Sequence, residues 1–209
     1  MEVLWYLTGP DGRYPWRADG ARKLSYAYFQ QLARAVDHLG YTGALLATGS
    51  HDAWIQGASL IPYTEHFQHL IAAHPPLLSP TLLAKMIATF DQFSKGRLRV
   101  NIVNGDAKLM AQYGVHLSHD ERYAYTDEYL TVLSALLRGE TVNFHGRHIH
   151  VVDAGVPLRP FSGPMSLCGL RVLRRQPMRW PPSTSIPISH GARRLNRPKQ
   201  KFARSKLSP

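Results

Sequence analysis

The sequence predicts an α/β fold, namely the N-terminal half of a (β/α)8 TIM barrel followed by an irregular C-terminal tail. Four short apolar runs alternate with four segments of helical spacing between residues 2 and 137. The apolar runs lack polar alternation, which is the pattern of strands buried on both faces. Each run ends in polar or small residues, and barrel enzymes place their chemistry at that edge of the sheet.

The first two strand–helix units precede residue 62. Glu2–Thr8 is apolar and aromatic, which predicts a strand, and Gly9-Pro10 ends it. Ser25–Leu39 is expected to be helical because its apolar residues share one face. Ala44–Ala47 is the second predicted strand, and Ala53–Ile61 is the second predicted helix.

The next two units follow the same order. His69–Ala73 is the third predicted strand, and Ser79–Phe93 is a helix with serine at its cap and proline in its first turn. Arg99–Val103 is the fourth strand, and Glu121–Leu137 is a longer helix. Gly139–Val151 alternates around a glycine, which predicts a small hairpin or an extended excursion.

Strands that alternate with helices call for a parallel sheet with right-handed crossovers. Two architectures satisfy this pattern: a doubly wound sheet and half of an eight-stranded barrel. No Gly-x-Gly-x-x-Gly follows the first strand, which disfavours a dinucleotide-binding doubly wound sheet. The half barrel is therefore the expected architecture.

Charge divides the chain into residues 1–162 and 163–209. The first part holds all 14 acidic residues and 14 of the 25 basic residues, so its formal charge is zero. The second part holds the other 11 basic residues and seven of the 15 prolines. Such a basic, Pro/Arg-rich tail cannot bury enough apolar surface to fold independently, so we expect it to be disordered.

Composition also limits the class of protein. A single cysteine, Cys168, excludes a disulfide framework and favours a cytoplasmic location. The N-terminus has no secretory pattern, and no apolar run reaches the ~20 residues that span a bilayer. The basic tail has no recognisable nucleic-acid-binding module, so nucleic acid is not expected as a partner.

Eight short strings resemble, in order, motifs of the bacterial luciferase-like flavin monooxygenases, and most closely the alkanesulfonate monooxygenases. The resemblance covers roughly residues 1–160. The strings are Leu39-Gly40-Tyr41-Thr42-Gly43, Asp52-Ala53-Trp54, Ser79-Pro80-Thr81, Ala88-Thr89-Phe90-Asp91, Ser94-Lys95-Gly96-Arg97, Asn101-Ile102-Val103-Asn104-Gly105, Glu121-Arg122-Tyr123 and Gly139-Glu140-Thr141-Val142.

The resemblance implies an enzyme that receives reduced FMN from a separate NAD(P)H-dependent flavin reductase. Such enzymes use O2 to cleave the carbon–sulfur bond of an alkanesulfonate or related organosulfur compound, giving sulfite and an aldehyde. Intact members are homo-oligomeric single-domain barrels longer than this chain. One departure concerns the substrate: the family's alkanesulfonate enzymes carry a cysteine in a longer loop before Asp52-Ala53-Trp54, and the shorter loop of this chain has no cysteine.

The same resemblance selects four cofactor-binding candidates. Asn101 lies in the middle of an apolar strand, where an amide needs a partner, and the family places an asparagine against the flavin; a structural hydrogen bond is the alternative. Thr48 ends the second strand, and the two roles considered for it are a flavin contact and a turn residue. His119 and Tyr123 flank the start of a helix, where anions bind favourably, and capping or packing are their alternative roles.

No catalytic residue is predicted, because the family's catalytic His, Arg and Tyr and its Gly-Ser-Ser phosphate loop have no counterpart in this chain. The adjacent His51 and Asp52 are not expected to act as an acid–base pair. His145, His148 and His150 have the spacing of metal ligands, but no acidic or cysteine partner accompanies them. We therefore expect no metal site.

The tail suggests a frameshift. Codons for Arg171–Arg193, read one base back, permit the string GSSPAAHAVAAEHVDTYLTWGE, which resembles the family's next segment. We therefore expect a truncated, poorly soluble chain without turnover, because four strands leave two open edges. Two alternatives remain: a nucleic-acid-binding protein that uses the tail, and a half barrel that functions only by assembly.

Overall fold

The computed structural model describes residues 2–15, 17 and 19–163. The chain divides into two units, residues 1–172 and 173–209, and every described residue lies in the first. The tail predicted for residues 163–209 therefore lies, except for Gly163, outside the described residues. The elements are β1 (Leu4–Tyr6), α1 (Tyr26–His38), β2 (Gly43–Leu46), α2 (Ala53–Leu60), β3 (Gln68–Ala73), α3 (Pro80–Ser94), β4 (Leu98–Ile102), α4 (Ala107–Gln112), α5 (His119–Arg138), β5 (Val142–His145) and β6 (His150–Ala154).

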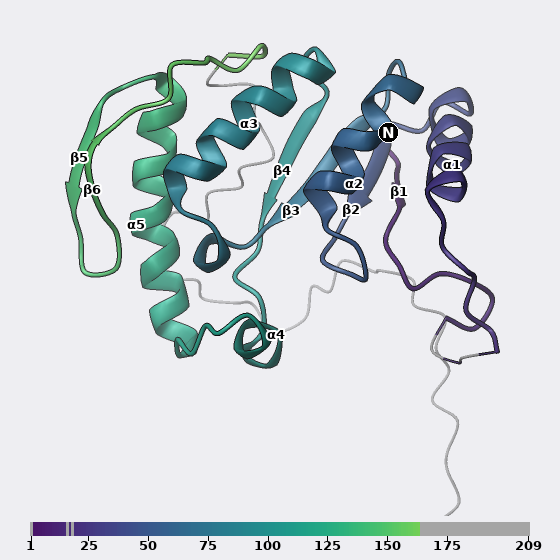
Figure 1. The fold of residues 1–209 in the computed structure, drawn as a ribbon, viewed down its shortest axis with the longest axis horizontal. Coiled ribbons are helices and arrows are strands. Elements are labelled where there is room, and N and C mark those ends of the chain that lie inside the picture. The colour runs from purple at the N-terminus through teal and green to yellow at the C-terminus, as the bar shows by residue number, and fades with distance from the viewer. Residues whose placement is uncertain (1, 16, 18, 164–209) are drawn as a thin grey trace, which may run out of the picture. The chain divides into compact units, whose positions relative to one another are not determined.

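The four strands β1–β4 form one parallel sheet in sequence order, with helices between them (Figure 1). Its register aligns Leu45 of β2 with Leu70 of β3 and with Arg99 of β4. The predicted α/β alternation is thus confirmed. Within residues 2–163 the sheet does not close, because β1 and β4 each pair with one neighbour only.

The prediction that both sheet faces are buried is wrong for the described residues. The side chains that face the helices are buried, whereas Leu45, Leu70, Arg99 and Asn101 on the opposite face are partly exposed. Helices cover one face, and no described element covers the other. The residues buried on the helix-covered face are Ala44, Leu46, His69, Ile71, Ala73, Leu98 and Val100; on the opposite face, Ala72 is also buried.

An ion pair spans the uncovered face. Glu2 precedes β1 at one sheet edge, Arg99 lies on β4 at the other, and their carboxylate and guanidinium groups form two hydrogen bonds of 3.0 Å. Three strand spacings separate these edges by about 14 Å in a flat sheet. Curvature of the kind found in a barrel wall brings the two side chains into contact.

Side-chain caps explain where the helices begin. The Asp52 carboxylate accepts hydrogen bonds from two backbone N–H groups at the start of α2, and Ser79 caps α3. Ser118 and Glu121 form a reciprocal capping box at the start of α5. Gly139 ends α5 with φ 78°, a left-handed conformation that glycine adopts without steric cost.

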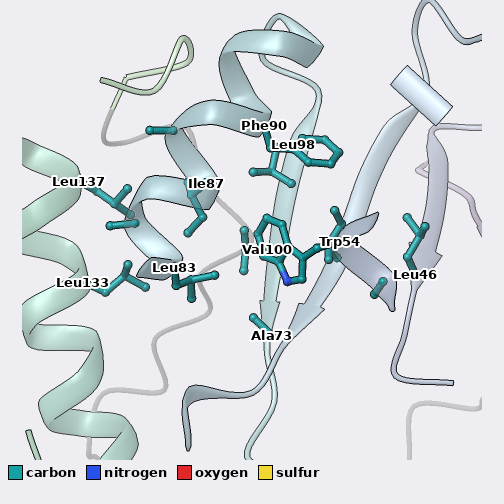
Figure 2. Packing of buried hydrophobic residues seen from close by; sticks show 14 of the residues in the cluster. Leu46, Trp54, Ala73, Leu83, Ile87, Phe90, Leu98, Val100, Leu133 and Leu137 are labelled. Atoms are coloured by element: carbon teal, nitrogen blue, oxygen red, sulfur yellow. The ribbon is translucent and has the colours of Figure 1, made fainter. Parts of the chain in front are cut away.

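The core is formed by the sheet and helices α1, α2, α3 and α5. Figure 2 shows Trp54 of α2 and Ile87 of α3 packed toward Val100 of β4, with Leu133 of α5 on the far side of α3. Burying each such Leu or Ile side chain contributes about 1.5–3 kcal/mol. The helical layer therefore supplies most of the apolar burial that holds the strands in register.

Two features complete the described chain. α4 was not predicted, because its six residues are too few to display a helical period; the Asp106 carboxylate starts it by accepting from the Leu109 N–H. The hairpin predicted after α5 is confirmed as β5 and β6, which pair antiparallel. α4 and the N-terminal end of α5 lie at the same side of the sheet as the strands' carboxyl ends (Figure 1).

Candidate functional site

A polar side chain follows each of the four parallel strands. The Thr8 hydroxyl, after β1, accepts a 2.8 Å hydrogen bond from the Ala47 N–H. Thr48 follows β2, His74 follows β3, and Asn104 follows β4, where its Oδ1 accepts from the Thr126 hydroxyl of α5 at 2.7 Å. Because carboxyl ends of parallel strands share one edge, these groups line a single border of the sheet.

His74 connects three strands at this edge. Its Nδ1 lies 2.8 Å from the Val103 carbonyl oxygen beyond β4, and its Nε2 lies 2.6 Å from the Thr48 hydroxyl beyond β2. A carbonyl oxygen only accepts, so Nδ1 carries a proton. In the neutral ring Nε2 is then the acceptor, and the Thr48 hydroxyl donates to it.

Burial favours this neutral ring. Only 7% of His74 is exposed, and desolvation lowers the pKa of the imidazole below its ordinary value. The hydrogen bond to Val103 and the charge of Asp106 oppose that shift without reversing it. The Thr48 hydroxyl therefore donates its hydrogen bond to His74, and its oxygen lone pairs can accept from another donor.

A cavity of about 380 Å³ lies against Thr48 and His74. Apolar side chains form one part of its wall, and polar ones form the rest. Its lining residues are Thr48, Gly49, Ser50, His51, Asp52, Ala53, Trp54, Ala72, Ala73, His74, Leu77, Leu78, Met86 and Tyr113.

His51 and Asp52 both line this cavity, but they do not form an acid–base pair. The Asp52 carboxylate caps α2 by accepting from the Trp54 and Ile55 N–H groups. The His51 Nδ1 lies 3.0 Å from the Ser50 hydroxyl, and its ring meets Phe29 edge-on at 5.1 Å. The Asp52 carboxylate thus serves as the N-cap of α2.

Two of the four predicted cofactor residues lie on or beside this edge. Thr48 lines the cavity directly. Asn101 lies on β4 and pairs in register with Ala72, which also lines the cavity. Asn101 is only half-buried, and within the described residues no hydrogen bond engages its amide. The amide lies on the uncovered face, where the side chain is partly exposed.

His119 and Tyr123 form a separate pair, one turn apart at the N-terminal end of α5. Their ring centroids are 4.8 Å apart, and both side chains are exposed. The His119 Nδ1 lies 2.9 Å from the Asp120 carboxylate. Neither residue lines the cavity beside Thr48, where the aromatic residues are Trp54 and Tyr113.

Sequence reasoning missed His74 and Tyr113. The signal for His74 was available, because it directly follows the predicted strand His69–Ala73. The signal for Tyr113 was absent, since only the short helix α4 brings it to the edge.

Over residues 2–15, 17 and 19–163, no three His, Cys, Asp or Glu side chains gather as metal ligands. Nor is any helix there long and apolar enough to cross a bilayer.

Solved structures with this fold include three monooxygenases. RslO1 from Streptomyces bottropensis is 22% identical with a TM-score of 0.66, and the match covers 78% of this chain and 51% of that one. EDTA monooxygenase from Chelativorans sp. BNC1 is 21% identical with a TM-score of 0.64, and the match covers 77% of this chain and 47% of that one. The oxygenating constituent of 3,6-diketocamphane monooxygenase from Pseudomonas putida, in complex with FMN, is 20% identical with a TM-score of 0.60. That match covers 79% of this chain and 49% of the other.

These likenesses show the fold, and the chain spans about half the length of the three structures. The family model for the luciferase-like monooxygenases matches residues 3–200. That range continues past residue 160, where the motif resemblance ended. Because the match covers most of the sequence, the chain belongs to the luciferase-like monooxygenase family.

Proposed function

We propose that this chain provides the flavin-binding edge of a reduced-FMN-dependent oxygenase of the alkanesulfonate monooxygenase type. The reaction would cleave a carbon–sulfur bond with O2 and release sulfite and an aldehyde. The observation that carries the proposal is the cavity beside the Thr48–His74 pair at the carboxyl edge of the parallel sheet. Enzymes built on barrel strands place their chemistry at this edge.

The lining of the cavity fits the ring system of a flavin. Trp54, Leu78 and Met86 offer apolar surface to a flat aromatic ring and exclude water from one side of it. When bound, reduced FMN supplies the electrons that activate O2. The FMN complex of the Pseudomonas putida relative supports a flavin in this fold.

Thr48 and His74 would orient the ring. His74 holds the proton of the Thr48 hydroxyl, so the Thr48 oxygen can accept a hydrogen bond from an N–H group of the reduced flavin. His74 is itself held by the Val103 carbonyl, which limits rotation of the imidazole. Asn101, His119 and Tyr123 remain proposed flavin contacts through the family resemblance.

The proposed partners follow from this chemistry. A separate NAD(P)H-dependent flavin reductase would deliver reduced FMN in the cytoplasm, and an alkanesulfonate or related organosulfur compound would be the substrate. No Lys or Arg is among the described residues that line the cavity. A cation that pairs with the sulfonate would therefore come from elsewhere in the barrel.

Flavin titration of the full chain tests the proposed site. We expect Thr48→Val to weaken binding of reduced FMN about fivefold, because one hydrogen bond contributes roughly 1 kcal/mol. His74→Asn should weaken it similarly by releasing the Thr48 hydroxyl. Anaerobic titration followed by tryptophan fluorescence gives both dissociation constants.

Thr131→Val is the matched control for that titration. The Thr131 hydroxyl is exposed on α5 and donates only to the Asp127 carbonyl. This variant should bind reduced FMN as the unchanged chain does. Equal affinity of the Thr48→Val and Thr131→Val proteins for reduced FMN would overturn the assignment.

A sulfite assay tests turnover separately. We expect the 209-residue chain, supplied with a reductase, FMN and an alkanesulfonate, to release no more sulfite than a protein-free control. The described sheet leaves the flavin edge open to solvent, and an open site cannot exclude water from the reaction. Sulfite well above that control would contradict this expectation and support an active chain.

A further inference from the structure

Two histidines face each other across the β5–β6 hairpin. His145 and His150 are register partners, and their Nδ1 atoms lie 3.1 Å apart. The ring centroids are 4.1 Å apart with an interplanar angle of 81°, and both residues are exposed. Neither belongs to the cavity beside Thr48 and His74.

This separation matches the spacing of two imidazole ligands on one metal ion. Zinc binds histidine nitrogen at about 2.0–2.1 Å, so two nitrogens at a tetrahedral angle lie about 3.3 Å apart. The 3.1 Å contact is a hydrogen bond in which one Nδ1–H donates to the other Nδ1, so an ion would replace that proton, and the rings would turn apart from their 4.1 Å centroid separation. We propose that the two Nδ1 atoms chelate one divalent transition-metal ion, with water at the remaining positions.

Hydrogen bonds hold the backbone of the hairpin in place before any ion binds. At its turn, the Glu128 carboxylate of α5 accepts hydrogen bonds from the N–H groups of residues 147, 148 and 149, at 3.0, 2.8 and 2.9 Å. At its open end, Asn143 and Asp153 exchange two hydrogen bonds of 3.1 and 2.8 Å. Little backbone entropy is therefore lost when the two rings share an ion.

The third histidine of the hairpin does not belong to the site. The ring of His148 lies 5.9 Å from that of Tyr125 on α5, and its Nε2 is buried. Of the three histidines in His145-x-x-His148-x-His150, His145 and His150 thus form the pair, and His148 packs against α5. Two protein nitrogens and no thiolate favour Cu²⁺, then Ni²⁺ and Zn²⁺.

Calorimetric titration of the untagged full chain with CuCl2, NiCl2 or ZnCl2 tests the site. We expect about one equivalent of ion to bind, tightest for Cu²⁺. His145→Asn or His150→Asn should weaken binding ~100-fold, since one ring alone loses the chelate effect. His66→Asn, at an exposed histidine outside the hairpin, should change the affinity less than ~3-fold because that ring is not a ligand.

Two readouts locate the ion independently of affinity. The electron paramagnetic resonance spectrum of the 1:1 Cu²⁺ complex should show hyperfine coupling to two imidazole nitrogens. Cu²⁺ should broaden the amide resonances of β5 and β6 before those near His74. Unchanged affinity in the His145→Asn/His150→Asn double variant, or broadening centred on another histidine, would overturn the proposal.

Discussion

His69 shows how a single side chain can weaken the fold it belongs to. Its ring lies on β3, fully buried between Phe67 and Phe90 at centroid distances of 4.8 and 5.2 Å. Neither ring nitrogen has a hydrogen-bond partner among the described residues. Burial, assisted by the nearby charge of Arg97, lowers the pKa of His69 to about 3. The folded protein therefore holds this ring neutral.

We expect His69→Leu to raise the free energy of unfolding at pH 7 by about 1–3 kcal/mol. The substitution keeps an apolar side chain of similar size and removes two unsatisfied polar atoms, each of which costs free energy when buried. Urea denaturation followed by circular dichroism measures the change. An equal or lower free energy of unfolding in the variant would contradict this account.

The same substitution should flatten the acid dependence of stability. The pKa of His69 is about 6.5 in the unfolded chain and about 3 in the folded protein. Between these values the unfolded chain binds more protons, so stability falls as the pH drops from about 6.5 to 3. Urea curves at pH 7 and 5 should differ less for His69→Leu than for His66→Leu, an exposed control.

Glu128 shows how one element fixes another. Its carboxylate, on α5, receives three backbone N–H groups from the turn of the β5–β6 hairpin. Burial raises the pKa of Glu128, but the three hydrogen bonds outweigh it, and the net shift is downward. The charged carboxylate therefore stabilises the hairpin above the unfolded pKa of about 4.5, and this contribution is lost as the pH falls through the lowered value.

We expect Glu128→Ala to loosen the hairpin while leaving the parallel sheet intact. Amide hydrogen exchange should accelerate at residues 147, 148 and 149, because their N–H groups lose a charged acceptor. The cost to global stability should be about 1–2 kcal/mol, since water can reach part of the turn. Asp127→Ala changes the neighbouring carboxylate and should leave those exchange rates unaltered; equal acceleration in both variants would refute the role of Glu128.

At the scale of the whole molecule, the described sheet has two unpaired edges and one uncovered face. Trp5 and Tyr6 of the edge strand β1 are 40% and 60% exposed. The ion pair between Glu2 and Arg99 crosses the uncovered face without covering its apolar residues. Exposed strand edges and apolar faces promote association with other chains.

We therefore expect the purified chain to self-associate in a concentration-dependent way. Tyr6→Lys should shift the sedimentation distribution toward the monomer, because a charge on an edge strand opposes strand pairing. Tyr123→Lys adds the same charge at an exposed position of α5 and should leave the distribution unchanged. A monodisperse monomer of the unchanged chain at all concentrations would rule out association through these edges. A soluble oligomer that binds FMN would favour a half barrel that functions by assembly.

Local sequence patterns predicted most of the architecture. The four strands and the helices predicted from Ser25, Ala53 and Ser79 were recognisable, because caps, glycines and apolar periodicity act over a few residues. Thr48 was found for the same reason, since it directly follows an apolar run. The short helix α4 escaped prediction because six residues contain too little periodicity.

The sequence by itself determined the order of strands and helices, the places where they begin, and membership of the family through its ordered motifs. Only the tertiary structure decided which polar groups meet: Thr48 with His74 across 26 residues, and His145 with His150 but not His148. It also decided that one face of the sheet is left uncovered within the described residues. Such contacts depend on strand register and on which face each side chain occupies, and residues far apart in the chain set both.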